Sequence, residues 1–298
     1  MAANALLKLR QALPELSATD SRVARAVIDD PTILDRTITE VAILCMTSPG
    51  TVARFCQKLG YSGYREFRIE VAAAAGREQA QRDRFHVADG EINRTDSAED
   101  VVAKIAYQEV LAIEETAKAL DLVTLDLVAT FIAASPRIDV YGFGSSGLAA
   151  QDLQQKLYRI GLSATSFPDM HLAWASAALQ RSGGVAIAIS HSGVTVETSN
   201  ALKIARAAGA TTVGITNFPD SPLVEYCDFV LTTQSRENRY RAGAMSSRIA
   251  QLALVDILFV RIAQSTYDDM TESLRLTYEA VQGHRMQPGD GRTATDQG

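Results

Sequence analysis

The spacing of hydrophobic residues changes partway along this chain. Up to about residue 75, apolar side chains recur every three or four positions, as in Leu6, Leu9 and Leu13 and again in Val52, Phe55 and Leu59. A period near 3.6 residues predicts amphipathic helices. The region is therefore expected to be entirely helical, with room for five or six short helices.

Farther along, helical spacing alternates with short apolar runs. Helices are expected over residues 101–120 and 122–134, a last one over 245–265, and strands at 137–141, 185–189, 211–215 and 229–231. Such alternation predicts βαβ units, and hence a parallel sheet with helices on both faces. The predicted fold class is α/β: an all-α helix-turn-helix domain followed by a doubly wound parallel-sheet domain.

A polar stretch separates the two patterns. Residues 76–97 contain few aliphatic side chains and two glycines, Gly76 and Gly90, as is typical of a linker. We therefore predict a helical domain over residues 1–75, a linker over 76–97 and an α/β domain over 98–282. Residues 283–298 are glycine-rich and polar and are expected to form a disordered tail.

Composition and charge bear on whether the protein enters a membrane and whether it can bind nucleic acid. No apolar run approaches the about 20 residues that cross a bilayer, and Lys8 and Arg10 interrupt the first leucine-rich segment, so neither a membrane span nor a signal peptide is expected. The net charge is −6, but residues 1–84 hold 12 Lys plus Arg against 10 Asp plus Glu, a balance of +2. The acidic excess thus belongs to the second domain, and the first stays compatible with a nucleic-acid partner.

Cysteine and histidine give no sign of a metal site. Cys45, Cys56 and Cys227 lack CxxC spacing and lie within apolar patterns, as expected for reduced core residues of a cytoplasmic protein. The four histidines form no HExxH or paired-ligand motif. We expect no metal.

One apolar run ends in an unusual cluster of hydroxyl groups. In AIAISHSGVTVET, residues 186–198, the predicted strand leads into Ser190, Ser192, Gly193 and Thr195, with a helix expected from about Val194. Free N–H groups at a helix start, hydroxyl donors and a glycine that permits close approach can hold an anion, such as a phosphate ester. An ordinary N-cap would explain one of these hydroxyls but not three.

A second strand ends in a similar way. The segment GFGSSG, residues 142–147, brings Ser145 and Ser146 to the start of another predicted helix, and the two loops could converge on one ligand. The paired glycines are also typical of a dinucleotide site, but no acidic residue follows at the required distance, and a P-loop would need a GKS or GKT sequence. No cofactor is expected.

These two segments resemble a family of sugar-binding domains. GFGSSGLAAQDLQQKLYRIG followed by AIAISHSGVTVET is similar to a sugar isomerase (SIS) domain over about residues 105–265, and GAMSSRIAQLALVDIL is similar to its closing helix in one regulator family. The resemblance implies a bound sugar phosphate. By that resemblance Ser190, Ser192 and Thr195, with Gly193, would hold the phosphate, and Ser145 and Ser146 would complete the pocket.

The helical domain contains two short helices at close spacing. Thr37 to Glu40 forms a capping box, Ser48-Pro49 starts another helix, and Cys45 to Thr47 lie between them, which is the spacing of a helix-turn-helix motif. The N-terminal residues of the second helix read bases in the major groove. The predicted DNA-contacting residues are Ser48, Thr51 and Arg54 near the bases, and Lys58, Arg65 and Arg68 at phosphates.

The modest charge of this domain leaves a helical oligomerisation module as an alternative. However, SPGTVARFCQKLGYSGYREFR resembles the signature of RpiR/MurR-type regulators, in which a helix-turn-helix domain precedes a SIS domain, and with both domains the resemblance covers nearly the whole chain. Two departures are Met46, where the motif often has glycine, and Gly50 in the first turn of the second helix.

Two functions remain open at this point. A phosphosugar isomerase would need a base, for which His191, Asp169, His171 and Glu237 are candidates, although each could equally contact the sugar without reacting. We predict a cytoplasmic regulator rather than an enzyme, which binds double-stranded DNA at a two-fold operator as a homodimer or homotetramer and responds to a phosphorylated sugar. Which sugar, and the direction of the response, are not encoded in these motifs.

Overall fold

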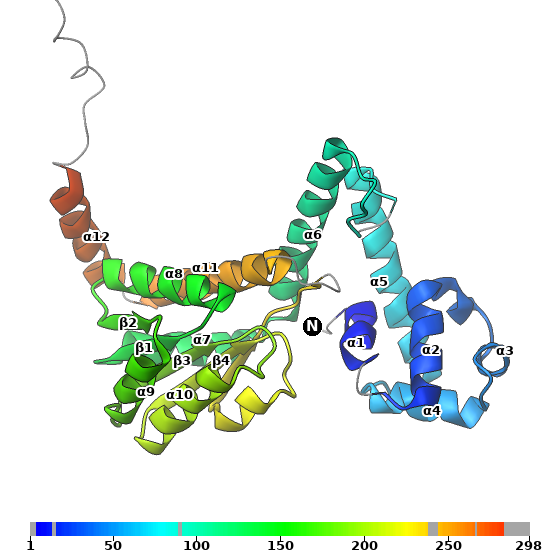
Figure 1. Cartoon of the computed structure of the whole chain (residues 1–298), viewed down its shortest axis with the longest axis horizontal. Helices are drawn as coiled ribbons and strands as arrows, with labels where there is room; N and C mark the ends of the chain where they lie inside the picture. The colour runs from blue at the N-terminus through cyan, green and yellow to red at the C-terminus, as the bar shows by residue number, and fades with distance from the viewer. Residues whose placement is uncertain (1–3, 14–15, 89–90, 238–243, 266, 283–298) are drawn as a thin grey trace, which may run out of the picture.

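The N-terminal part of the chain is a bundle of helices. The computed structural model describes residues 4–13, 16–88, 91–237, 244–265 and 267–282. Within the first two of these ranges the elements are α1 (Ala5–Ala12), α2 (Ala18–Asp29), the 3-10 helix η2 (Pro31–Asp35), α3 (Ile38–Leu44), α4 (Pro49–Lys58) and α5 (Tyr64–Phe85) (Figure 1). The apolar positions that predicted these helices are buried together, among them Leu6, Leu9, Val23, Val52 and Phe55. The all-helical prediction is thus confirmed for this part of the chain.

The predicted linker differs from the structure in its first ten residues. Helix α5 continues through Gly76 to Phe85, and the loop that follows ends at Ser97, which caps α6. Polar residues with good helix propensity, mainly Arg, Glu, Gln and Ala, fill residues 76–85, so the absence of an apolar stripe there did not mean the absence of a helix. Helices α5 and α6 meet at an acute angle next to this loop (Figure 1).

The second part of the chain is built on a parallel sheet. After α6 (Ala98–Ala119) and α7 (Leu122–Ala133), its strands are β1 (Ile138–Tyr141), β2 (Ala164–Phe167), β3 (Val185–Ile189), β4 (Thr211–Thr216) and β5 (Phe229–Thr232). They are joined by α8 (Ser145–Arg159), α9 (Met170–Ala178), α10 (Val196–Ala207) and the 3-10 helix η3 (Pro222–Tyr226). The strand order is β2-β1-β3-β4-β5, and every pair is parallel.

Helices cover both faces of this sheet. Ile138, Val140 and Ile187 lie in one core with α7, α8 and α11 (Met245–Ser265), whereas Tyr141 and Ala188 lie in a second core with α9, α10 and η3. Alternate residues of β1 and β3 therefore point to opposite cores, as strand geometry requires. The predicted doubly wound α/β fold is confirmed.

Several elements were absent from the sequence prediction, among them α9, β2 and α12. Strand β2 is a short edge strand in which only Ala164 is buried, so it lacks the apolar run that marks the central strands. Helix α12 (Tyr267–Gln282) follows the last predicted helix and is largely exposed. The expected disordered tail, residues 283–298, lies outside the described residues. None of the described helices is long and apolar enough to cross a membrane.

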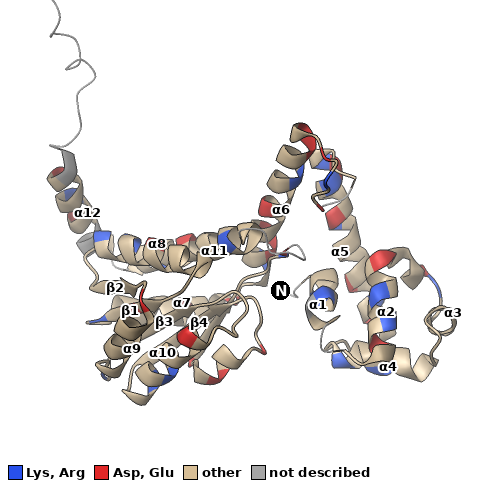
Figure 2. Cartoon of the chain, viewed as in Figure 1, with Lys and Arg blue, Asp and Glu red and all other residues tan. Residues whose placement is uncertain are grey.

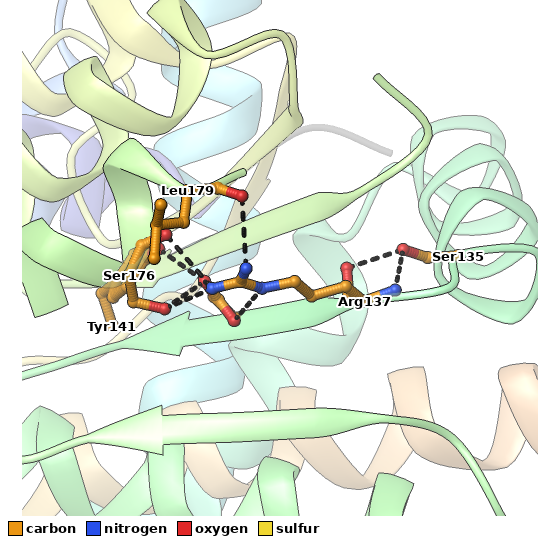
Figure 3. A network of polar contacts seen from close by, with 6 residues as sticks. Ser135, Arg137, Tyr141, Ser176 and Leu179 are labelled. Atoms are coloured by element: carbon orange, nitrogen blue, oxygen red, sulfur yellow. Dashed lines mark hydrogen bonds and ion pairs between the residues drawn. The ribbon is translucent and has the colours of Figure 1, made fainter. Parts of the chain in front are cut away.

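A buried polar network ties β1 to α9. The Asp139 carboxylate, whose residue is 1 % exposed, accepts hydrogen bonds from Arg137 Nη2 at 3.1 Å, Tyr141 Oη at 3.1 Å and Ser176 Oγ at 2.7 Å (Figure 3). Arg137 also donates to the carbonyl of Leu179 at the end of α9. Burial and the adjacent Asp139 charge raise the pKa of Tyr141, so its hydroxyl keeps its proton and remains a donor. The network thus fixes the strand that leads into the first serine loop.

Candidate functional site

Both serine loops begin at the point where the strand order reverses. In a 2-1-3-4-5 sheet this point lies between β1 and β3, where ligands bind at the carboxyl ends of the strands. Tyr141, the last residue of β1, is paired with Ala188 of β3, so the two strands end next to each other. Residues 142–147 and 190–195 follow these two ends.

The helices after β1 and β3 start without a side-chain cap. The N-cap of α8 is Gly144, which has no side chain, and the N-cap of α10 is Thr195, whose side chain accepts no hydrogen bond from the first turn. Other described helices have such a cap: α1, α2, α3, α4, α6, α7 and α9. Helix α5, which begins after Gly63, is also uncapped. At the switch point, then, two sets of free N–H groups and two positive helix ends are left for an anion.

In the second loop, the serines have different roles. Ser190 is 3 % exposed, and its Oγ accepts from Gly193 N at 3.2 Å and donates to Thr195 Oγ1 at 3.2 Å. Ser192 and Thr195 are half-buried, and Ser192 Oγ accepts from Val194 N at 3.4 Å. Helix α10 begins at Val196 rather than near Val194 as expected, because residues 190–194 form this hydrogen-bonded turn. The loop is shaped by Ser190 and offers Ser192 and Thr195 toward solvent.

Gly193 has no room for a side chain. Its φ is +63°, and a Cβ atom would lie 1.9 Å from Ser221 Oγ. Its carbonyl also accepts from Leu223 N at 3.0 Å, which joins the loop to η3. The glycine is required for this close approach as well as for its backbone conformation.

We expect Gly193→Ala to lower the free energy of unfolding by about 1 to 3 kcal/mol, since it combines a clash with left-handed strain. Urea denaturation followed by the fluorescence of Trp174, the single tryptophan of the chain, measures this. As a control, Gly76→Ala on α5 has no heavy atom within 4 Å of its Cβ and should be neutral or slightly stabilising. Equal stability of the two variants would contradict the tight packing around Gly193.

The first loop is held by a contact from α11. A Cβ on Gly142 would lie 2.7 Å from the carbonyl oxygen of Ser146, and Gly144 has φ +58°, so both glycines are needed for the tight turn. Gln251, 1 % exposed on α11, donates from Nε2 to Ser146 Oγ at 3.1 Å. The Ser146 hydroxyl thereby has its acceptor side occupied and its proton available for a ligand. The only signal for Gln251 in the sequence is an amide between the apolar residues Ala250 and Leu252.

The candidate sugar contacts lie in different settings. Asp169 caps α9 by accepting from Leu172 N at 3.0 Å, and His171 is exposed on that helix. His191 is 8 % exposed, with its ring edge-on to Phe218 at 5.6 Å between centroids. Glu237 Oε1 accepts from Ser247 N at 2.7 Å in the first turn of α11. Both carboxylates among these candidates thus already serve as acceptors for helix N–H groups.

Helices α3 and α4 have the predicted helix-turn-helix arrangement. Thr37 and Glu40 form the capping box of α3, and Ser48 caps α4 by accepting from Thr51 N. Met46 in the turn has φ +50°, which explains why glycine is common at this position. Arg22 of α2 donates to the carbonyls of Cys45 and Met46, both at 3.2 Å, and so anchors the turn. The sequence pattern did not predict that contact.

The outward face of α4 has a short chain of polar side chains. Ser48 Oγ lies 2.9 Å from Thr51 Oγ1, to which Arg54 Nη2 donates at 3.3 Å. Ser48 and Arg54 are exposed, whereas Val52, Phe55 and Leu59 are buried as predicted. Figure 2 shows basic residues on α1, α2 and α4, with acidic residues among them. The start of α4 is therefore accessible to a DNA groove.

The predicted phosphate contacts are all exposed, but one has a structural partner. Arg65 and Arg68 lie on the outer face of α5. Lys58 Nζ is 2.7 Å from Oδ2 of Asp20, a residue of α2 that is 4 % exposed. Lys58 thus neutralises a buried carboxylate and joins α4 to α2, whatever it also does at a phosphate.

Known proteins match both parts of the chain. The helix-turn-helix domain of the rpiR family matches residues 3–78, and the SIS domain matches residues 131–261. An HTH-type transcriptional regulator of Caldanaerobacter subterraneus is 35 % identical over 277 residues, which cover 93 % of this chain and 96 % of the relative. One of Haemophilus influenzae is 29 % identical over 95 % of this chain and 98 % of its own length.

Among solved structures, Vibrio vulnificus NanR, complexed with ManNAc-6P, is similar over 95 % of this chain and 100 % of its own, with a TM-score of 0.60 and 28 % identity. A sugar-phosphate isomerase from Listeria monocytogenes, at 22 % identity and a TM-score of 0.56, shares the fold over 62 % of this chain and 99 % of its own. A helix-turn-helix region joined to a SIS domain defines a transcriptional regulator with a sugar-binding type of domain. The chain belongs to the rpiR family of such regulators.

Proposed function

We propose that this regulator binds a phosphorylated sugar between β1 and β3 and that the occupied and empty forms differ in affinity for operator DNA. The observation that carries the proposal is the pair of uncapped helix starts at the switch point, each beside serine hydroxyls. NanR, similar over 95 % of this chain, is complexed with ManNAc-6P, which supports the same ligand class here. Because the proposed function requires operator DNA, the protein would act in the cytoplasm, the cell compartment that holds the DNA.

The phosphate would contact side chains from both loops together with free N–H groups. Ser192 and Thr195 are the half-buried hydroxyls of the second loop, and Ser145 and Ser146 those of the first. Ser190 would act mainly by holding the loop in shape. The sugar would then lie toward the remaining candidate residues, Asp169, His171, His191 and Glu237, one or more of which would distinguish one sugar from another.

We propose that this domain binds its ligand without turning it over. An isomerase needs a positioned base free to take a proton, whereas Asp169 and Glu237 accept from helix N–H groups. Isothermal titration with glucose 6-phosphate, fructose 6-phosphate and ManNAc-6P, followed by NMR of the same mixtures, tests both points. Saturable binding with unchanged ligands supports the proposal, and isomerisation would instead favour the enzyme.

Arg54→Ala is expected to weaken binding to the specific operator by about 1 to 3 kcal/mol and to relax base preference at one position, because the start of α4 is the part that enters the groove. Fluorescence anisotropy on operators randomised at single positions measures this. Arg25→Ala, an exposed position on α2, is the matched control and should change affinity little. An equal loss on every sequence would make Arg54 a phosphate contact.

We further propose a dimer as the DNA-binding form, since helix-turn-helix proteins read two-fold operators in pairs. The described surface offers a face for it: large hydrophobic residues of α7 and α11 are exposed next to one another, namely Leu122, Val123, Leu127, Phe131 and Val260. Exposed apolar residues of this number on packed helices are typical of an interface.

A further inference from the structure

A buried carboxylate lies where the helical region meets the sheet domain. Glu78 of α5 is 3 % exposed, and its Oε1 pairs with two guanidinium groups. One belongs to Arg10 of α1, at 3.3 Å, and the other to Arg236, which follows β5. Glu78 is therefore bound from both sides of the junction: Arg236 is 158 residues away from it in sequence, and Arg10 is 68 residues away.

The charge state of this cluster favours the paired form. Burial alone would raise the pKa of Glu78, but the hydrogen bond and charge of Arg236, with those of Arg10, outweigh it and lower that pKa. Glu78 is thus ionised at neutral pH and stabilises two cations. Removal of Glu78 would leave two guanidinium cations without their anion in a poorly solvated place, whereas removal of Arg236 would leave Glu78 paired with Arg10 alone.

Arg236 is linked to the second serine loop by two hydrogen bonds through the backbone. Its neighbour Ser235 donates from N to Asn217 Oδ1 at 2.8 Å, and Asn217 N donates to the carbonyl oxygen of His191 at 3.0 Å. His191 lies between Ser190 and Ser192. A shift of this loop on binding a phosphate would therefore displace the segment that contains Arg236, because these hydrogen bonds join the two.

The first serine loop reaches the same segment by another route. Ser146 accepts from Gln251 of α11, and the first turn of that helix donates from Ser247 N to Glu237, the residue after Arg236. Both phosphate-binding loops thus connect to residues 235–237 by described contacts. Only Arg236 extends from there, through a described ion pair, to the helix-turn-helix side of the chain.

A cavity beside the ion pair gives it room to open. The cavity measures about 370 Å³ and is lined by Glu78 and Arg236 together with Arg10, Arg82 and Gln234, among others. A buried pair with no adjacent space would be very costly to separate. Polar walls and a volume of this size can hold water, which would solvate the carboxylate and the guanidinium if they separated.

We propose that the Glu78–Arg236 ion pair is a latch that couples occupancy of the serine loops to the orientation of the helix-turn-helix region. The inference has two halves. The orientation half states that the ion pair sets the orientation of the helix-turn-helix region, and it needs no ligand. The coupling half states that ligand binding acts on operator affinity through this pair, and it rests on the proposed function. A coupling is physical only if an element has two states that both sites bias, and the ion pair beside its cavity is that element.

The orientation half is tested by distances in the full chain without ligand or DNA. Spin labels at Asp29 on α2 and Ala178 on α9, both exposed, are measured in samples diluted with unlabelled chain so that only pairs within one chain count. We expect Glu78→Gln and Arg236→Gln to broaden or shift the distance distribution. Glu70→Gln, the same change on the same helix at a residue without an ion pair to another described residue, should not. Unchanged distributions in both latch variants would overturn the proposal.

The coupling half is tested by the ratio of operator Kd with and without saturating ligand, using the three sugar phosphates above. We expect the wild-type ratio, of about 5- to 150-fold for a typical allosteric protein, to fall within twofold of unity in both latch variants, while titration calorimetry still detects ligand binding. A ratio equal to that of the wild type would overturn the latch even if the distances change. If the wild type itself shows no ratio, the proposed function fails, and the distances still decide whether the ion pair sets the orientation.

Discussion

Replacing both Ser190 and Ser192 by alanine is expected to weaken sugar phosphate binding at least about 100-fold. A hydrogen bond to a charged group contributes about 1.5 to 3 kcal/mol, and 1.4 kcal/mol corresponds to about a factor of ten in affinity. Replacing Ser192 would remove a direct hydrogen bond to the phosphate. Replacing Ser190 would remove its hydrogen bonds with Gly193 N and Thr195 Oγ1, which keep the loop in shape. Operator binding by the ligand-free variant should stay within about threefold of the wild type.

Titration calorimetry and operator anisotropy on the same preparation measure these two effects. Ser163→Ala is the matched control, because Ser163 is exposed and lies before β2, at the amino end of the strands, whereas the serine loops lie at the carboxyl end. The single variants separate shape from contact: Ser190→Ala should also lower stability, whereas Ser192→Ala should not. Undiminished ligand affinity in the double variant would remove the second loop from the site.

Asp139→Ala is expected to lower the free energy of unfolding of the sheet domain by about 3 to 4 kcal/mol, because it leaves three buried or half-buried donors without their acceptor. Those donors belong to Arg137, Tyr141 and Ser176. The loss should not reach the top of the range for broken buried pairs, since 38 % of the Arg137 side chain is exposed. Arg137 can therefore recover some hydration.

Trp174 lies on α9 next to this network, so urea denaturation followed by its fluorescence reports the affected domain. Asp126→Ala is the control: Asp126 pairs with Arg261 at 2.6 Å, but both side chains are about half exposed, and such pairs contribute less than about 1 kcal/mol. Similar losses in the two variants would show that the Asp139 network adds no more than a surface ion pair.

Most of the fold could be predicted because its elements differ in period. The central strand β3 is a continuous apolar run, and β1 and β4 are mostly apolar or β-branched, as is typical of strands in a sheet covered on both faces. Strand β2 has no such run, and α12 covers little, so neither leaves a strong pattern. The polar half of α5 resembles a linker in sequence, because the pattern of apolar residues carries no information about helix propensity.

The serine loops and the start of α4 could be predicted because their residues are close together in sequence. Contacts that position them could not, since they join distant residues: Gln251 reaches Ser146 across 105 positions, and Arg22 reaches the α3–α4 turn across 23. The same holds for the Glu78–Arg236 pair, 158 residues apart. Local motifs thus indicate which groups act, and the tertiary structure shows what holds them in place.

The most direct test of the proposed function is fluorescence anisotropy of the full-length protein on the DNA upstream of its own gene, with random DNA for comparison. The operator is titrated in the presence of glucose 6-phosphate, fructose 6-phosphate, ManNAc-6P and their unphosphorylated sugars. We expect specific binding that one phosphate ester changes at least fivefold and its parent sugar does not. Specific binding that no phosphate ester changes, in a protein that binds the same ester by calorimetry, would contradict the coupling of the two sites.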